Sequence, residues 1–486
     1  MKPADLGFGS RVPPEVVSHV LSWLHDSYDI SDASRVCRAW YKLAFPHLHQ
    51  HMNINRIRYL HTLTVRLELE TAEKEFKVGP FLRALTIKLV PDVLGDSWHR
   101  PLLIRFERVL SRLIHLELLD VVYASSPSLM SIFQSFQNQC PKLRWVIIGR
   151  SGGGPQDDRN EEVFIFKDLK RLQISWRHLD LQSPSHVPSS LTKMIEGSPM
   201  LDELRLNLIA LEMDDDHIDT PWWPSAFFSC LANPLVYLRT LQIGGEYDID
   251  WGIFLEESSQ CALRRFFEQH PDLHTVAFQW SDERRMDLAF KPHLAESLFP
   301  SVQQFGGPLA ICAGVAGSRL AEQLRELNVH YDPSDSIQPD NNTFETLAQA
   351  MRLMPKLEGL SLTISNTEAT DNHPEKVFLE TATLDKMLAA MPNVWSILIG
   401  APIDWTQMVQ PLRHVPHLTE FHFKDSRRSK LEDAILFKRI AVEMFNVCPM
   451  LRQIISLREK DEGGFLNLYR TVDRFGDTTE ISLCPF

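Results

Sequence analysis

A short pattern of apolar positions recurs along most of the chain. It reads Leu-x-x-Leu-x-[Leu/Ile/Val], with mainly polar residues between the apolar ones. Clear copies begin at Leu60, Leu82, Leu113, Leu143, Leu169, Leu201, Leu238, Leu273, Leu324, Leu357, Val394, Leu418 and Leu451, and a degraded copy begins at Val302. The mean step of about 30 residues leaves room for one strand and one helix per repeat. The pattern therefore predicts a strand at each copy.

A second pattern lies between these predicted strands. Apolar residues at i, i+3 and i+4 precede a proline in five stretches, around Phe133, Met194, Phe266, Leu347 and Met387. This spacing predicts amphipathic helices. The step Pro-x-[Leu/Val] then follows at Pro141, Pro199, Pro271, Pro300, Pro355, Pro392, Pro416 and Pro449. Because proline ends a helix and is tolerated where a strand begins, a helix–proline–strand unit is expected to repeat along the chain.

The first sixty residues follow a different pattern. Val16, Val20 and Leu24, flanked by Val17 and Leu21, form an i, i+4, i+8 stripe that predicts a short helix begun by two prolines. A second helical stretch is predicted from about residue 30 to 45, ended by Pro46. Helices this short cannot bury a core of their own, so we expect a docking element.

These patterns predict an α/β protein with three parts. Residues 10–50 form a short all-helical module, and residues 51–456 form a solenoid with parallel strands on its concave side and helices on its convex side. Residues 457–486, which include the stretches from Gly463 to Arg470 and from Glu480 to Leu483, are expected to form a hairpin-like cap on the solenoid.

The N-terminal pattern resembles a known family. Val12-Pro13-Pro14-Glu15-Val16 with Leu21 and Leu24, followed by the run from Ser34 to Ala44, is similar to the F-box. The Cys-Pro steps at Cys140 and Cys448 resemble those of the leucine-rich repeats that accompany F-boxes. The resemblance implies docking to the Skp-type linker of SCF ubiquitin ligases, and through it to a cullin. The implied linker contacts are Val12, Pro13, Val16, Val20, Leu21, Leu24, Val36, Trp40 and Leu43, with Trp40 as the expected anchor.

The repeats also predict a recognition surface. Strand side chains alternate, so the residues between the anchor leucines face the concave side. From this set we select as candidate substrate-binding residues Trp145, Arg205, Gln242, Asn328 and His422. Trp145 is the preferred contact, because an exposed aromatic side chain is costly unless a partner covers it.

Composition narrows the function classes. Of the 486 residues, 44% are hydrophobic and 23% charged, which excludes disorder as the main state. Lys and Arg number 50 against 63 Asp and Glu, and the net charge of −13 argues against a nucleic-acid binder. Residues 1–60 differ, with 7 basic and 5 acidic side chains. Seven cysteines without a Cys-x-x-Cys pair indicate reduced thiols and no zinc finger. With no membrane or signal segment expected, the prediction is a soluble protein of the cytoplasm or nucleus.

Four local motifs could carry chemistry. Gly149-Arg150-Ser151-Gly152-Gly153 matches the nucleophile elbow of hydrolases, but loop residues rather than a helix follow it. Asp214 to Asp216 with His217 and Asp219 could gather a cation, although acidic loops are usually just solvated. His47 and His51 have a chelating i, i+4 spacing without further ligands nearby. We therefore predict no metal, no cofactor and no catalysis. Trp222 and Trp223 either tuck under the array or present an aromatic patch.

The sequence thus favours a non-enzymatic substrate adaptor of an SCF-type ubiquitin ligase, which binds a Skp-type linker and an unidentified protein substrate. The alternative is a leucine-rich-repeat scaffold that binds proteins without any role in ubiquitin transfer. Neither hypothesis involves nucleic acid or a membrane.

Overall fold

The computed structural model describes residues 12–24, 27–70, 76–89, 100–123, 127–150, 163–179, 188–211, 219–220, 222–245, 247–256, 260–279, 290–331, 341–364, 381–425, 431–457, 466–472 and 478–485. The chain divides into two compact units. Unit 1 contains residues 1–220 and 230–237, and unit 2 contains residues 221–229 and 238–486.

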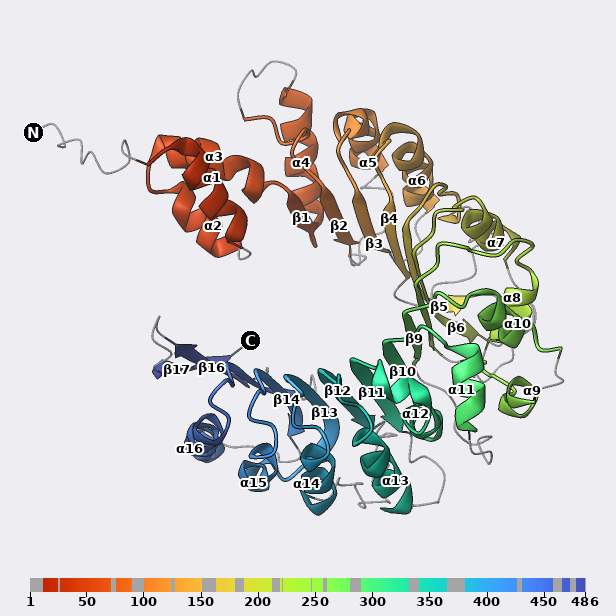
Figure 1. The fold of residues 1–486 in the computed structure, drawn as a ribbon. Coiled ribbons are helices and arrows are strands. Elements are labelled where there is room, and N and C mark those ends of the chain that lie inside the picture. The colour runs from red at the N-terminus through yellow and green to blue at the C-terminus, as the bar shows by residue number, and fades with distance from the viewer. Residues whose placement is uncertain are drawn as a thin grey trace, which may run out of the picture. The chain divides into compact units, whose positions relative to one another are not determined.

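Unit 1 begins with three helices and continues with alternating strands and helices (Figure 1). Its elements are α1 (Pro14–Trp23), α2 (Ser27–Ser34), α3 (Arg38–Leu48), β1 (His51–Ile54), α4 (Ile57–Leu69), β2 (Ala84–Leu89), α5 (Arg100–Val109), η2 (Leu110–Arg112), β3 (Leu118–Tyr123), α6 (Pro127–Gln139), β4 (Trp145–Arg150), β5 (Arg171–Leu179), α7 (Ser189–Glu196), β6 (Glu203–Leu211) and β7 (Asp219–Thr220). Strands β1 to β6 pair in sequence order and in parallel, and β7 pairs antiparallel with β6.

Unit 2 continues the same alternation. Its elements are α8 (Pro224–Ser229), β8 (Thr240–Gly245), α9 (Trp251–Leu255), α10 (Ala262–Gln269), β9 (Thr275–Phe278), α11 (Pro292–Leu298), β10 (Gln304–Pro308), α12 (Leu309–Ala316), η5 (Arg319–Glu322), β11 (Glu326–Tyr331), α13 (Asn341–Met351), β12 (Gly359–Ile364), α14 (Thr381–Ala389), β13 (Ser396–Ile403), η6 (Trp405–Gln407), α15 (Val409–Leu412), β14 (Glu420–Asp425), α16 (Leu431–Val447), β15 (Gln453–Leu457), β16 (Leu466–Val472) and β17 (Thr478–Pro485). Strands β8 to β15 are parallel, whereas β16 and β17 form an antiparallel pair that joins β15.

The predicted α/β solenoid is confirmed. In each unit the helices cover one face of the parallel sheet, and the anchor leucines are buried between the two layers (Figure 1). Leu85, Leu119, Val146, Leu172 and Leu204 are each fully buried and occupy the same place in successive strands. All eight Pro-x-[Leu/Val] prolines lie in the turn between a helix and the next strand, as the pattern predicts.

A ladder of backbone hydrogen bonds connects these turns. In unit 1 the N–H of Glu117 donates to the carbonyl of Arg83, and Arg144, Lys170 and Asp202 continue the series at 2.7–3.0 Å. The same ladder runs in unit 2 from His274 to Arg452. The buried thiol of Cys448 donates to the carbonyl of Leu412 at 3.1 Å, and burial raises the pKa of this thiol to about 12. The Cys-Pro step is therefore a packing feature at this position.

Two predicted strand positions are wrong. The copy at Leu60 lies in helix α4, where Leu60, Leu63 and Leu67 are buried, because an i, i+3 spacing suits a helix face as well as this repeat. The first strand is instead β1. The copy at Leu113 is displaced by three residues, since Leu116, Leu119 and Val121 occupy the anchor positions of β3.

The predicted helix over residues 30–45 is also wrong in its bounds. The chain forms two helices there, α2 and α3, because Cys37 is extended at φ −163° and ψ 170° and interrupts the helical run. Helix α3 continues through Pro46 to Leu48. Pro46 lies in the last turn, where its missing N–H removes little of the helical hydrogen bonding.

Glu70 fixes the join between α4 and the following turn. Its side chain is buried, and its carboxylate accepts hydrogen bonds from the backbone N–H groups of Val78 and Gly79, the latter at 3.2 Å. A Cβ at Gly79 would lie 2.8 Å from the carbonyl oxygen of Arg112, so only glycine fits there. The carboxylate thus accepts hydrogen bonds from two buried backbone N–H groups that lie outside the strands and helices.

Removing that carboxylate is expected to destabilise unit 1. Glu70→Ala leaves two buried N–H groups without an acceptor, which costs about 1–3 kcal/mol of unfolding free energy. Chemical denaturation of the full chain measures the effect, with the exposed Glu117→Ala as the control. Equal stability of the two variants would contradict the assigned role of Glu70.

Candidate protein-interaction surfaces

The N-terminal helical module, residues 12–48, has a small core of its own, so the expectation that helices this short bury none is wrong. Val17, Leu21, Ile30 and Ala44 are buried in it, and Leu24, Ala33, Trp40, Leu43 and Leu48 pack partly buried against them. The stripe of apolar residues on α1 therefore splits into two faces. Val17 and Leu21 face the core, while Val16 and Val20 face outward.

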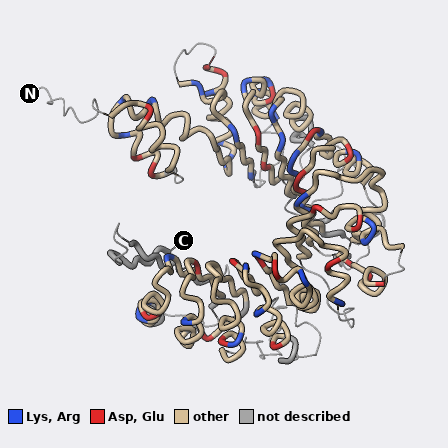
Figure 2. Tube along the Cα trace, in the orientation of Figure 1, with Lys and Arg blue, Asp and Glu red and all other residues tan. Residues whose placement is uncertain are grey.

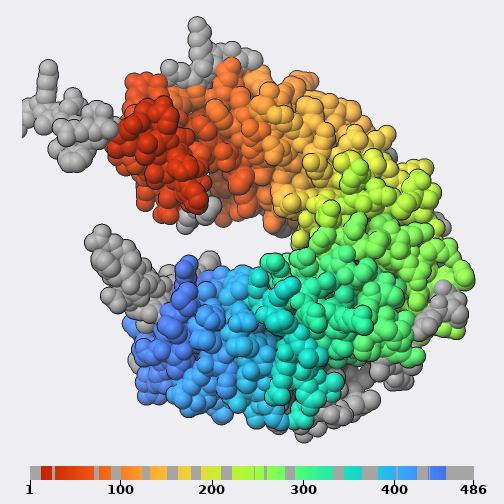
Figure 3. Space-filling view, viewed as in Figure 1, coloured from red at the N-terminus to blue at the C-terminus, as the bar shows by residue number. Residues whose placement is uncertain are grey.

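The outward face of α1 is an exposed apolar stripe. Val16 is 49% exposed, Val20 48% and Trp23 67%, and the i, i+4, i+7 spacing places them on one side of the helix. Tyr28 and Val36, on or next to α2, are 80% and 64% exposed. Figure 3 shows this module as a continuous red surface at the N-terminal end of unit 1. Large apolar side chains exposed together mark an interaction site.

The residues implied as linker contacts occupy different environments. Val12, Pro13, Val16, Val20 and Val36 are exposed. Leu24, Trp40 and Leu43 are partly buried against the module core, and Leu21 is fully buried in it. Leu21 therefore holds the helices together rather than offering a contact surface, because no atom of it is accessible. Trp23 and Tyr28 are also exposed, but they are not among the contacts that the F-box resemblance implies. The spacing of Trp23 from Val16 and Val20 could have indicated it from the sequence.

The module is attached to the first repeat by aromatic contacts. Phe45 of α3 packs edge-on against Phe76 and Phe81, with ring centroids 5.3 and 6.2 Å apart. A hollow of about 440 Å³ lies between α3, β1 and α4, lined among others by Tyr41, His49 and Arg66. Burial, assisted by Arg66, lowers the pKa of His49. These contacts make α3 part of the wall of the first repeat.

The five candidate substrate-binding residues all lie on the open sheet face, the face opposite the helices. Trp145 and Arg205 lie on β4 and β6 of unit 1, whereas Gln242, Asn328 and His422 lie on β8, β11 and β14 of unit 2. Each is partly exposed. The guanidinium of Arg171 covers the indole of Trp145 at 4.9 Å, so part of the tryptophan surface is already paired.

The open face of unit 2 carries groups with shifted titration. Burial, with nearby Glu358, raises the pKa of Glu326, and burial lowers the pKa of His422 against the opposing effect of Glu420. Burial lowers the pKa of His330 to about 4, and its buried Nδ1 has no hydrogen-bond partner. Both histidines are therefore neutral at physiological pH.

His330 makes the stability of unit 2 sensitive to acid. Its pKa is lower in the folded state than the ordinary 6.5, so the unfolded chain binds the proton more readily below that pH. The contribution of neutral His330 is present above about pH 6.5 and is lost as the pH falls towards 4, up to about 3 kcal/mol. His330→Gln should flatten the unfolding free energy over this window. An unchanged pH profile in that variant would contradict the assignment.

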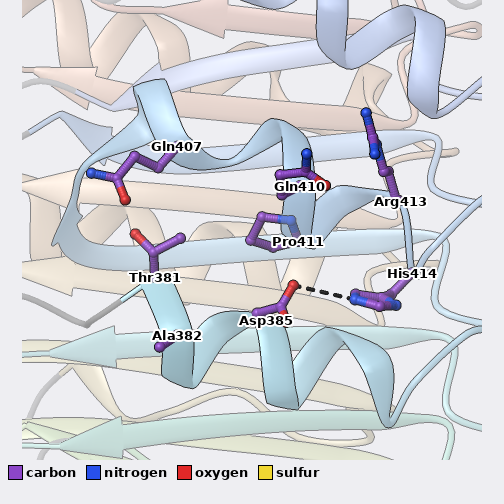
Figure 4. A pocket seen from close by; sticks show the side chains of 8 residues that line it. All are labelled: Thr381, Ala382, Asp385, Gln407, Gln410, Pro411, Arg413 and His414. Atoms are coloured by element: carbon purple, nitrogen blue, oxygen red, sulfur yellow. Dashed lines mark hydrogen bonds and ion pairs between the residues drawn. The ribbon is translucent and has the colours of Figure 1, made fainter.

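One groove on the helical side of unit 2 resembles a reactive site (Figure 4). It has a volume of about 500 Å³ and lies between α14, η6 and α15. His414 Nε2 lies 3.2 Å from Asp385 Oδ1, with Thr381 on the same wall. The His414 and Asp385 side chains are 41% and 48% exposed, so water competes for both. An exposed surface hydrogen bond accounts for this contact.

The other motifs that could carry chemistry form no catalytic or metal site among the described residues. Ser151 and the acidic run 214–217 lie outside the described residues. Within the described ranges, no group of three or more His, Cys, Asp or Glu side chains is placed to hold a metal ion. His47 belongs to α3 and His51 to β1, so the two do not share a helix. No helix in the described part is long and apolar enough to cross a membrane.

Trp222 and Trp223 of the 221–224 segment have different environments, one buried and one exposed. Trp222 is buried, its indole N–H donates to the carbonyl of Gly244 at 3.2 Å, and its ring meets Phe227 edge-on. Trp223 is 45% exposed. Trp222 thus packs into unit 2, and Trp223 lies at its surface.

Comparison with known proteins places the module in a family. Residues 10–55 match the family model described as F-box-like. A search of curated proteins finds no match. The chain therefore carries an F-box-like domain at residues 10–55, and parallel strand–helix repeats follow it.

Solved structures align with this chain at low identity and low TM-score. The yeast Rad7–Elc1 complex aligns with 85% of this chain and 88% of that chain, at 13% identity and a TM-score of 0.39. The TLR13–ssRNA13 complex aligns with 78% of this chain and 57% of that chain, at 12% identity and a TM-score of 0.33. A Bacteroides fragilis protein aligns with 62% of this chain, at 13% identity and a TM-score of 0.24. The alignment covers 64% of that protein, so this chain spans just under two thirds of its length. Identities and scores this low indicate nothing about ligands or partners.

Proposed function

We propose that the chain is the substrate-recognition adaptor of an SCF-type ubiquitin ligase. The N-terminal helices bind a Skp-type linker, the linker joins the chain to a cullin complex, and the repeats hold a protein substrate. The observation that carries the proposal is the exposed stripe of Val16, Val20 and Trp23 on a folded, F-box-like module.

The chemistry of linker binding is hydrophobic burial. Covering the tryptophan and the two valines of the stripe with a partner would be favourable, because each contributes about 1.5–3 kcal/mol when buried. Val12, Pro13 and Val36 extend the surface, and Trp23 serves as the aromatic anchor. Leu24, Trp40 and Leu43 are half-buried beside it and contribute their accessible edges.

The proposed mechanism is positioning, without catalysis by this chain. A substrate held on the repeats is kept near the conjugating enzyme carried by the cullin, which raises the effective concentration of its lysines. Trp145, Arg205, Gln242, Asn328 and His422 are proposed substrate contacts. The adaptor acts in the cytoplasm or nucleus, where such ligases work, and needs no cofactor.

Substrate trapping tests this function against a scaffold without a ligase role. The wild-type chain and the variant Val16→Asp/Val20→Asp are expressed in cells and purified, and retained proteins are quantified by mass spectrometry. We expect the linker and cullin with the wild type only, and the substrate with both, accumulating on the variant. Equal recovery of every partner by both chains, without a linker, would favour the scaffold.

A further inference from the structure

A cluster of charged and aromatic residues crosses three strands of unit 1 on the open face. Trp145 of β4 is in register with Arg171 of β5, which is in register with Glu203 of β6. Arg205 lies two residues after Glu203, and therefore on the same face of β6. We refer to Trp145, Arg171, Glu203 and Arg205 as the arginine cluster.

Contacts within the arginine cluster fix its geometry. The Arg171 guanidinium stacks over the Trp145 ring at 4.9 Å. The Glu203 side chain is only 12% exposed, and its two oxygens lie 2.5 Å from Arg205 Nε and 3.6 Å from Arg171 Nε. One partly buried carboxylate therefore forms ion pairs with two arginines. Arranged in this way, the arginines lose little side-chain freedom when they bind an anion.

The terminal nitrogens of these arginines have no partner in the described structure. Glu203 is the acidic group that pairs with Arg171 and Arg205 among the described residues, and it engages Nε in both cases. The side chains of Arg171 and Arg205 are 45% and 42% exposed. Their Nη groups are the donors that bind carboxylates in a bidentate manner.

The surrounding charge is basic, although the whole chain is acidic. Arg144 and Lys170 lie in the turns just before β4 and β5 and are exposed. Residues 141–150, 167–179 and 202–211, which form β4 to β6 and the turns before them, contain eight Lys or Arg and three Asp or Glu. The net charge of the chain is −13. Figure 2 shows both basic and acidic residues along these strands. A local positive field on an acidic protein selects an acidic partner.

We propose that the arginine cluster binds an acidic segment of the protein substrate, an extended peptide whose Asp or Glu side chains reach Arg171 and Arg205 while an apolar side chain lies against Trp145. This inference rests on the proposed adaptor function and adds the class of substrate to it. The open face of unit 2 is less suitable for such a peptide, because Glu326, Glu358 and Glu420 lie along it.

Peptide binding to the full chain tests the inference. The probe is a fluorescein-labelled peptide of alternating Glu and Ala residues, compared by fluorescence anisotropy with the same peptide carrying Gln for Glu. We expect the Glu peptide to bind more tightly and its affinity to fall with added salt. Arg171→Glu with Arg205→Glu should weaken it at least about tenfold, and Trp145→Ala about threefold.

A charge reversal on unit 2 provides the control. Arg325 has a 53% exposed side chain and pairs with Glu358 at 3.4 Å, so Arg325→Glu is matched to each single substitution, Arg171→Glu and Arg205→Glu, which change the net charge by the same amount. It should leave the affinity for the Glu peptide unchanged. Equal binding of the Glu and Gln peptides, an equal loss with Arg325→Glu, or tighter binding of single-stranded DNA than of the Glu peptide would overturn the inference.

The same variants separate this inference from the adaptor function. Arg171→Glu/Arg205→Glu should still bind a Skp-type linker, because the cluster lies outside the helical module. Linker binding without preference for the acidic peptide overturns the inference alone. Acidic-peptide binding without linker binding supports the arginine cluster and contradicts the adaptor function.

Discussion

Val16→Asp combined with Val20→Asp lowers the affinity of the full chain for a purified Skp-type linker at least about 100-fold. Both side chains lie on the exposed stripe of α1, and complex formation would bury the two new carboxylates without a partner. Isothermal titration calorimetry measures the change. Because Val16 and Val20 are 49% and 48% exposed, the thermal stability of the free chain should be unaffected.

Val236→Asp is the matched control for this variant. Val236 is 64% exposed and belongs to unit 1, but lies outside the helical module. The control should bind the linker as well as the wild type does. An affinity of the double variant within about threefold of the control would mean that the linker contacts another face of the module.

Phe267→Ala is expected to destabilise unit 2 by about 3–5 kcal/mol. Phe267 of α10 is fully buried, and its ring contacts Phe254, Phe278 and Phe299 at centroid distances of 6.0, 5.8 and 5.0 Å. Alanine would leave a cavity that the short strand β9 cannot close without losing its register. Denaturant unfolding of the full chain, followed by circular dichroism, measures the loss.

Ile253→Ala is the control in the same region, since Ile253 is 48% exposed and should cost less than about 1 kcal/mol. If the two variants unfolded at the same denaturant concentration, the aromatic layer between α10 and β9 would not be a core.

The repeated architecture was predictable because each repeat gives the same signal. The anchors at Leu143, Leu169 and Leu201 precede strands that the pattern predicts, and the prolines mark the turns. The failures occur where one spacing fits two structures. Leu60, Leu63 and Leu67 suit a helix face, and Leu113, Leu116 and Leu119 allow two registers for β3. Local sequence alone does not decide between these alternatives, because tertiary packing does.

The candidate surfaces were only partly predictable for a related reason. The sequence shows that Val16, Val17, Val20 and Leu21 are apolar, but which of them face outward depends on how α1 packs against α3. Trp145 was recognised from strand alternation. Arg171 was not, because its stacking on Trp145 and its contact with Glu203 depend on the register of three strands.

The central claim is that this chain joins a ubiquitin ligase through its N-terminal helices. Size-exclusion chromatography with light scattering, on the purified full chain mixed with a purified Skp-type linker at micromolar concentration, tests it most directly. We expect an equimolar complex that Val16→Asp/Val20→Asp abolishes. Separate elution of the wild-type chain and the linker under the same conditions would contradict it.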